Sequence, residues 1–216
     1  MNRIGGLYLV TDRELCGRRP LKDVVLQAVK GGVTCVQLRE KDPAVTTRCF
    51  VEEARAMKDL LAPYHVPLVI NDRLDVALAA GADGVHIGQQ DMPYGHARQI
   101  LGPKALIGLS VEDWADVEVA LTLDVDYLGV SPVFDTPTKT DTKKAWGLQG
   151  LSRIRAATTL PLVAIGGLNA ANAEAVVMAG ADSIAVVSAL CAAPDPLAAA
   201  ADLARIIAAA LARRSS

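Results

Sequence analysis

The feature that most constrains the fold is a regular alternation of short β-branched runs and longer helical segments along all 216 residues. Helical patterns such as residues 43–62 and 195–213 separate the runs, and glycine closes several of them, as in "AAGADGV". The runs that we predict to be strands are residues 7–12, 35–41, 67–72, 84–88, 105–110, 127–133, 161–167 and 183–189.

Eight such units with no linker or shift in composition predict an α/β fold, a single-domain (β/α)8 barrel over residues 1–216. The alternative is a doubly wound open sheet, which carries a glycine fingerprint after its first strand. The segment "TDRELCGRR" follows the first run and has no such fingerprint, so the barrel is favoured. A barrel gathers its active site at the carboxyl ends of the strands and in the loops that follow them.

Composition limits the partners and the cellular compartment that we expect for the protein. The chain has 22 basic and 24 acidic residues, and this near-neutral balance argues against a nucleic-acid partner. Its four cysteines are scattered, and its amino-terminal segment lacks the apolar core of a signal peptide, so we expect a cytoplasmic protein. No apolar stretch reaches the roughly 18 residues that span a bilayer, so no membrane partner is expected. The apolar final helix would cover either the barrel or a second copy, so a homo-oligomer is one of two expectations.

The second predicted strand ends in "QLREK". Alternation along a strand places Gln37, Arg39 and Lys41 on one face and Leu38 and Glu40 on the other. Two cations on one face make a poor core but a good anion site, because guanidinium matches phosphate oxygens bidentately and ammonium adds a point charge. The alternative is a solvated loop in which both cations pair with Glu40 or another nearby carboxylate.

Two aspartates follow the next strands. Asn71 and Asp72 end the third run, and Asp91 lies in the turn after the fourth. Each aspartate alone would suit the cap of the next helix. Two carboxylates on adjacent units beside two cations instead suit Mg²⁺, which takes oxygen ligands and bridges carboxylates to substrate phosphates. The three isolated histidines give little support for a zinc site.

A second anion site is predicted after the last three strands, at Thr136, Thr138, Gly167, Val187 and Ser188. In many barrels the loops after the seventh and eighth strands present backbone N–H groups to a phosphate. The alternatives are a solvated loop around "TPTK" and a tight turn at "IGG". Lys139 would join the first anion site. No cysteine or serine stands beside a histidine in a recognisable nucleophile arrangement, so these patterns predict a barrel enzyme that acts on phosphorylated small molecules with Mg²⁺.

Seven motifs, in the order "QLREK", "IND", "HIGQQD", "GLS", "TPTK", "IGG" and "AVVSA", resemble the thiamine-phosphate synthase family over residues 7–190. The resemblance implies a transferase that joins a hydroxymethylpyrimidine diphosphate to a thiazole phosphate, giving thiamine monophosphate and diphosphate. It also implies a dissociative reaction, in which diphosphate leaves first and the thiazole nitrogen captures a pyrimidine-stabilised carbocation.

The resemblance assigns roles to particular residues. It implies a pyrimidine diphosphate site made of Gln37, Leu38, Arg39, Glu40, Lys41, Asn71, Ser110 and Lys139. Catalytic roles would belong to Arg39, Lys41, Ser110 and Lys139, with Ser110 near the reacting carbon. The thiazole phosphate would be held by Thr136, Pro137, Thr138, Gly167, Val187 and Ser188. Mg²⁺ would be carried by Asp72 and Asp91.

Three positions depart from the family pattern. Glu112 stands where a histidine is frequent, Ser131 replaces a glycine, and Asp135 replaces a proline. One alternative function is a thiazole tautomerase-like isomerase, which is associated with a histidine near position 112 and needs only one phosphate site. Another is a non-catalytic binder of thiamine precursors. The cations and the aspartate pair favour the synthase.

Overall fold

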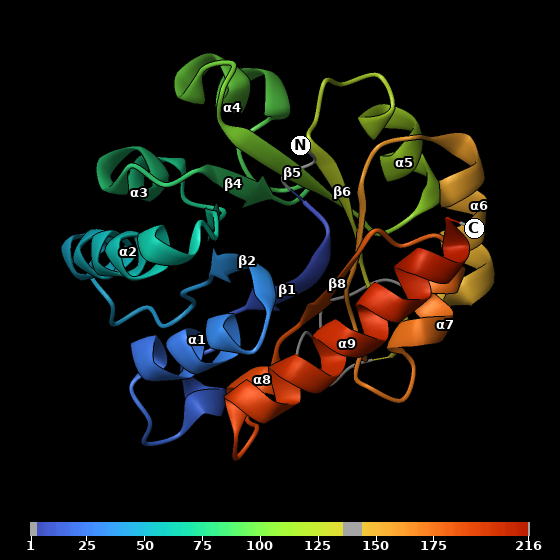
Figure 1. Ribbon diagram of the computed structural model, residues 1–216. Helices are drawn as coiled ribbons and strands as arrows, with labels where there is room; N and C mark the ends of the chain where they lie inside the picture. The colour runs from blue at the N-terminus through green and yellow to red at the C-terminus, as the bar shows by residue number, and fades with distance from the viewer. Residues whose placement is uncertain (1–3, 136–143, 216) are drawn as a thin grey trace.

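The eight predicted strands form a closed parallel barrel in the computed structural model, which describes residues 4–135 and 144–215 (Figure 1). The strands are β1 Gly6–Val10, β2 Val33–Leu38, β3 Leu68–Asn71, β4 Gly84–Ile87, β5 Leu106–Val111, β6 Tyr127–Val130, β7 Leu162–Ala164 and β8 Ser183–Val186. Each strand pairs in parallel with the next, and β8 closes on β1 with Tyr8 opposite Ala185. The predicted (β/α)8 barrel is therefore confirmed.

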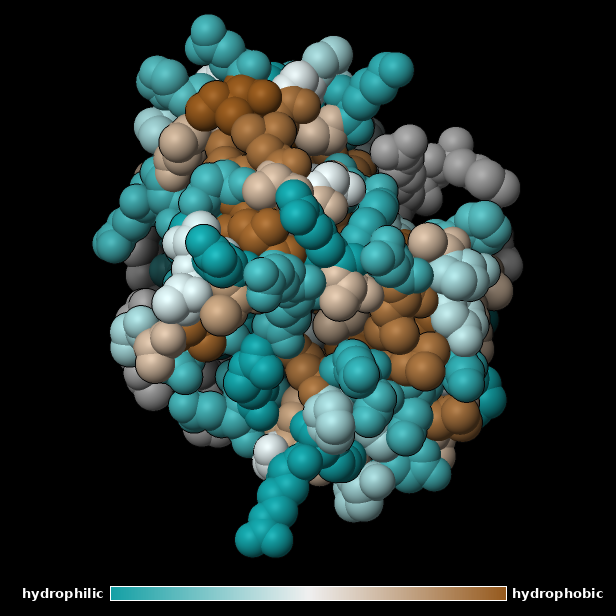
Figure 2. All heavy atoms as spheres, turned by 90° about the vertical axis from the view of Figure 1, so that its left-hand side faces the viewer, coloured by the Kyte–Doolittle hydropathy of each residue, from teal (hydrophilic) through white to brown (hydrophobic). Residues whose placement is uncertain are grey.

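Helices surround the barrel on its outer side (Figure 1). They are α1 Leu21–Lys30, α2 Thr47–Leu61, α3 Leu74–Ala80, α4 Tyr94–Leu101, α5 Trp114–Ala120, α6 Gly147–Ala157, α7 Ala173–Met178, α8 Ser188–Cys191 and α9 Pro196–Arg214, with short 3₁₀ turns η1 Glu14–Cys16 and η2 Ala62–Tyr64. Their outer faces mix hydrophilic side chains with apolar patches, as Figure 2 shows for the side that carries α2 and α3.

Most predicted strands extend too far at their carboxyl ends. The second was expected to reach residue 41, but β2 stops at Leu38, where its pairing with Ile70 on β3 ends. Arg39 and Lys41 therefore lie in the loop after the strand. Alternation of side chains does not indicate where the neighbouring strand stops, and parallel pairing ends with the shorter partner.

The core has two layers, because successive residues of a strand face opposite sides of the sheet. Leu9, Val36 and Leu38 belong to the layer between strands and helices. The inner layer fills the barrel with Ile4, Tyr8, Val10, Cys35, Val69, Leu106, Tyr127, Val163 and Ala185. This packing closes the barrel toward the amino ends of the strands and leaves polar side chains to line the end where the strands finish.

The final helix covers the barrel, which was one of the two expectations for it. Buried Leu203 and Ile207 on α9 join the outer core, and the helix packs between α1 and α7. Neither α9 nor any other helix of the described residues is long and apolar enough to cross a membrane.

Candidate active site

A cavity of about 650 Å³ opens among the carboxyl ends of the strands. Its volume lies within the usual range for small-molecule sites. All eight strands or the loops after them contribute to its wall. The predicted site residues found there are Gln37, Arg39, Lys41, Asn71, Asp72, Asp91, Ser110, Gly167, Val187 and Ser188. The tertiary structure thus brings together residues that are widely separated in the sequence.

Two predicted residues turn their side chains elsewhere. Leu38 is fully buried in the outer core, because the alternation that directs Gln37 inward directs its neighbour outward. Glu40 accepts hydrogen bonds from the Arg13 guanidinium at 3.1 Å and the Asp42 N–H at 2.9 Å. Neither side chain lines the cavity, so contact with a substrate there would need their backbone. Thr136, Pro137, Thr138 and Lys139 lie outside the described residues.

Both predicted cations are paired with carboxylates. Arg39 Nη1 lies 3.5 Å from Asp12 Oδ2, and Lys41 Nζ lies 2.6 Å from Asp72 Oδ2. Neither cation pairs with Glu40, which binds Arg13, but both have a nearby carboxylate as partner, as the alternative interpretation allowed. Partly exposed ion pairs of this kind are worth about 0–1 kcal/mol. Either cation can therefore exchange its partner for an anion that enters the cavity.

Asp72 and Asp91 do not cap helices. The N-cap residue of α3 is Arg73 and that of α4 is Pro93, so neither aspartate caps the helix that follows it. Asp72 has a left-handed backbone, with φ of 61°, and Asp91 Oδ2 accepts the Gly88 N–H at 2.7 Å. Burial, together with the neighbouring Asp72 carboxylate, raises the pKa of Asp91. Both carboxylates line the cavity, and their role as a metal pair stays a prediction.

The donor set fits Mg²⁺ better than a metal that needs a complete protein cage. No group of three or more histidine, cysteine, aspartate or glutamate residues is arranged for a metal within residues 4–135 and 144–215. Mg²⁺ commonly uses one or two carboxylates and completes its shell with water and substrate phosphate. Asp72 and Asp91 line the cavity and would supply that number of hard oxygen ligands.

The opposite wall is made of backbone after β7 and β8. Gly166 and Gly167 have φ of 104° and 66°, and a Cβ at Gly167 would lie 2.8 Å from the Asp135 carbonyl oxygen. Asn172 Nδ2 steadies this turn by donating to the Gly167 carbonyl at 2.9 Å. The single turn α8 begins at Ser188, directly after β8. The N–H groups of Leu190 and Cys191 in this turn donate to the Val187 carbonyl, so the donors that α8 can offer to the cavity are at its start, near Ser188.

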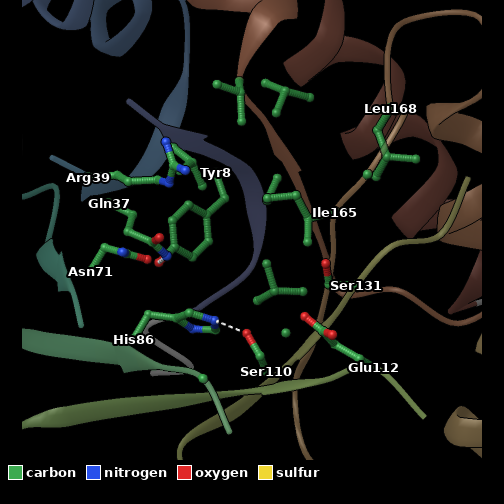
Figure 3. A pocket seen from close by; sticks show the side chains of 18 of the residues that line it. Tyr8, Gln37, Arg39, Asn71, His86, Ser110, Glu112, Ser131, Ile165 and Leu168 are labelled. Carbon is green, nitrogen blue, oxygen red and sulfur yellow. Dashed lines mark hydrogen bonds between the residues drawn. The ribbon is translucent and has the colours of Figure 1, made fainter. Parts of the chain in front are cut away.

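Sequence patterns did not indicate a polar chain that crosses the barrel. Gln37 Nε2 donates to Tyr8 Oη at 3.0 Å, which lies 2.9 Å from Tyr127 Oη. Tyr127 Oη lies 3.1 Å from His86 Nδ1, and His86 Nε2 lies 2.8 Å from Ser110 Oγ (Figure 3). The signal that could have revealed it is a polar residue within the apolar runs that form β1, β2, β4, β5 and β6, on the same face of the strand as Gln37. The barrel thus places a serine beside a histidine from the neighbouring strand, a contact that the sequence did not reveal.

Tyr8 and Tyr127 remain uncharged within this series of hydrogen bonds. Burial raises the pKa of Tyr8 and of Tyr127 well above the ordinary tyrosine range. The His86 ring stacks on the Tyr127 ring with centroids 5.5 Å apart. Glu112 and Ser131, two departures from the family pattern, also line the cavity (Figure 3). The cavity therefore has an aromatic floor with hydrogen-bonding groups, between a wall of cations and carboxylates and a wall of backbone donors.

This arrangement defines a class: a (β/α)8-barrel enzyme with a cationic, carboxylate-bearing wall suited to a phosphorylated substrate. Comparison with known proteins identifies the family. The family described as thiamine monophosphate synthase matches residues 7–190. The chain belongs to the thiamine-phosphate synthase family.

Individual relatives agree with the family match over nearly the whole chain. The thiamine-phosphate synthase of Albidiferax ferrireducens is 62% identical over 201 residues, which is 93% of this chain and 91% of that protein. The synthase of Vibrio campbellii is 52% identical over 193 residues, covering 89% and 93%. A solved thiamine phosphate pyrophosphorylase from Pyrococcus furiosus has a TM-score of 0.88 at 38% identity, covering 97% of this chain and 98% of that one.

Proposed function

We propose that the protein joins 4-amino-2-methyl-5-hydroxymethylpyrimidine diphosphate to 4-methyl-5-(2-hydroxyethyl)thiazole phosphate, giving thiamine monophosphate and diphosphate. It is a transferase of the pyrimidinylmethyl group. The observation that carries the proposal is the meeting of Arg39 and Lys41 with the Asp72–Asp91 pair on one wall, in a chain of this family. Such a wall suits a diphosphate leaving group.

The reaction breaks the bond between the pyrimidine methylene carbon and the diphosphate oxygen, and the electron pair leaves with diphosphate. The lone pair of the thiazole nitrogen then forms the new C–N bond, so no protein nucleophile is consumed. Arg39 and Lys41 stabilise the negative charge that develops on the leaving group. Ser110 faces the same cavity and is assigned to the region of the reacting carbon.

Asp72 and Asp91 would hold Mg²⁺ at the edge of the leaving-group site. When bound, the ion would neutralise part of the diphosphate charge. Lys41 already contacts Asp72, so its ammonium lies beside the same leaving group. Gln37 and Asn71 on the adjoining wall would hold the rest of the first substrate, with Lys139 from the segment outside the described residues.

The thiazole phosphate is assigned to the opposite wall. Gly167, Val187 and Ser188 line it and offer backbone donors. Thr136, Pro137 and Thr138 are assigned to the same phosphate and lie outside the described residues. Anchoring each substrate by its own phosphate holds the thiazole nitrogen in line with the methylene carbon, which converts a bimolecular step into an effectively intramolecular one.

The partners proposed are the two phosphorylated small molecules alone, and the proposed location is the cytoplasm. All four cysteines are free thiols, which suits a reducing compartment. A homo-oligomer stays a prediction, and sedimentation equilibrium of the purified protein would test it.

A coupled assay for diphosphate release tests the proposed function. Purified protein receives the pyrimidine diphosphate and Mg²⁺, with and without thiazole phosphate, and again with EDTA. We expect release that needs both substrates, stops with chelator and matches thiamine monophosphate formation. Absence of release from protein that still binds thiazole phosphate would favour the isomerase or the non-catalytic binder.

A further inference from the structure

With the Gln37 amide nitrogen placed on Tyr8, one direction is favoured for the hydrogen bonds that end at Ser110. The Gln37 amide nitrogen can only donate, so Tyr8 Oη accepts its proton at 3.0 Å. The Tyr8 proton then goes to Tyr127 Oη at 2.9 Å, because the nearby Cys35 offers only a weakly accepting thiol. Tyr127, which accepts from Tyr8, then has His86 Nδ1 at 3.1 Å as the acceptor for its own proton.

The opposite direction is unfavourable. If His86 Nδ1 donated to Tyr127 and Tyr127 donated to Tyr8, the Tyr8 oxygen would accept twice and its own proton would have only the thiol of Cys35. A buried donor without a good acceptor costs about 1–3 kcal/mol. Tyr8 and Tyr127 are both fully buried, so water does not supply that acceptor.

The sequence provides room for these rings. A Cβ at Gly108 would lie 2.0 Å from Tyr127 Cζ, and a Cβ at Gly129 would lie 2.6 Å from His86 Cε1. Any larger residue at Gly108 would displace the Tyr127 ring, and any larger residue at Gly129 would displace the His86 ring. Two inward-facing glycines therefore fix the places of Tyr127 and His86 in a tightly packed interior.

We propose that His86 is a positioning residue for the transfer reaction: its Nε2–H donates to Ser110 Oγ and leaves the Ser110 hydroxyl proton free to bond the first substrate. This inference rests on the proposed function for its catalytic consequence. Because Nδ1 accepts from Tyr127, the ring proton lies on Nε2, 2.8 Å from Ser110 Oγ (Figure 3).

The same tautomer explains why this serine–histidine contact is not a nucleophile pair. In a nucleophilic triad the histidine accepts the serine proton at Nε2 while Nδ1–H donates to a carboxylate. Here Nδ1 faces a phenol that donates, so Nε2 has no lone pair for the Ser110 proton. Ser110 is thus presented as a hydrogen-bond donor, which agrees with a reaction in which no covalent bond to the enzyme forms.

Nitrogen-15 spectra of the imidazole rings test the tautomer without relying on activity. The chain has three histidines, and loss of one set of signals in His86→Gln assigns the ring. At about pH 8, above the ordinary histidine pKa, we expect an unprotonated Nδ1 and a protonated Nε2 in the wild type. A protonated Nδ1 would overturn the proposal.

Kinetics of two matched variants test the consequence. His86→Gln places an amide nitrogen near the position of Nε2, whereas the shorter side chain of His86→Asn reaches only the position of Nδ1. We expect His86→Asn to lower kcat roughly ten-fold, as for loss of one hydrogen bond. His86→Gln should retain kcat within about three-fold, and KM for thiazole phosphate should change in neither variant.

A double-variant cycle separates positioning from a general loss of packing. In a Ser110→Ala background, His86→Asn should lower kcat no further, because the hydroxyl that it orients is gone. A full ten-fold loss in that background, or equal losses in the Gln and Asn variants, would overturn the proposal. If His86→Asn does not fold, the same cycle is run with Tyr127→Phe, which removes the donor to Nδ1. An inactive wild type would refute the proposed function, and the nitrogen spectra would still decide the tautomer.

Discussion

Arg39 and Lys41 carry the leaving-group assignment at the scale of single residues. We predict that Arg39→Ala lowers kcat/KM for the pyrimidine diphosphate roughly 10- to 100-fold, the range for lost hydrogen bonds to a charged group. KM for thiazole phosphate should stay unchanged, because that phosphate is assigned to the opposite wall. Steady-state kinetics with each substrate varied in turn measure both effects.

Arg48→Ala is the matched control, since Arg48 is an exposed arginine on α2 and does not line the cavity. It should leave both kinetic constants unchanged. Equal losses for the two substrates in Arg39→Ala would contradict the division of the cavity into two anion sites.

Asp72 tests the metal assignment. Its positive φ is one that asparagine tolerates better than most residues, so Asp72→Asn removes charge with little backbone strain. We predict that the half-saturating Mg²⁺ concentration in the diphosphate-release assay rises roughly ten-fold or more. Asp75→Asn, at an exposed carboxylate paired with Arg73 on α3, is the control. An unchanged Mg²⁺ titration in Asp72→Asn would remove Asp72 from the ligand set.

Aspartates at the amino ends of β4, β6 and β8 join neighbouring elements in the same way. Each carboxylate accepts a backbone N–H from near the start of the preceding strand and a cation from a helix. The accepted groups are Leu68 N–H and Lys58 for Asp83, Ile107 N–H and Arg98 for Asp126, and Leu162 N–H and Arg155 for Asp182. These contacts lie at the end of the barrel opposite the cavity, where they favour stability.

We predict that Asp126→Ala lowers the free energy of unfolding by about 1–3 kcal/mol, because it leaves the Ile107 N–H without its acceptor at 2.8 Å. Denaturant titration measures the change, and kcat of the folded protein should be unaltered. Asp202→Ala, which breaks an exposed i,i+3 pair with Arg205, should change stability by less than about 0.5 kcal/mol. Equal effects in the two variants would show that the bridge to β5 contributes nothing.

At the scale of the whole molecule, α9 completes the helical ring by packing against α1. A Cβ at Gly31, which follows α1, would lie 2.4 Å from the Leu197 carbonyl oxygen and 2.7 Å from Ala200 Cβ. We predict that Gly31→Ala destabilises the protein by about 1–3 kcal/mol through this overpacking. Thermal unfolding followed by circular dichroism measures it.

Gly95→Ala is the control for that prediction. Gly95 lies inside α4 and faces open space, since no heavy atom beyond its own helix backbone comes within 4 Å of the position that a Cβ would take. The higher helix propensity of alanine should make this variant as stable as the wild type or up to about 1 kcal/mol more stable. If Gly31→Ala is as stable as the wild type, α9 moves away from the added methyl group with no loss of stability, which would contradict the prediction.

The sequence by itself determined the eight strands, the barrel, and most of the charged residues on its cavity wall, because these depend on local periodicity and on position after a strand. Only the tertiary structure decided which side chains meet. Tyr8 and Tyr127 are 119 residues apart yet share a hydrogen bond, and Asp72 contacts Lys41 instead of capping α3. Such contacts depend on the stagger at which β8 closes on β1 and on where each strand ends, and side-chain alternation encodes neither.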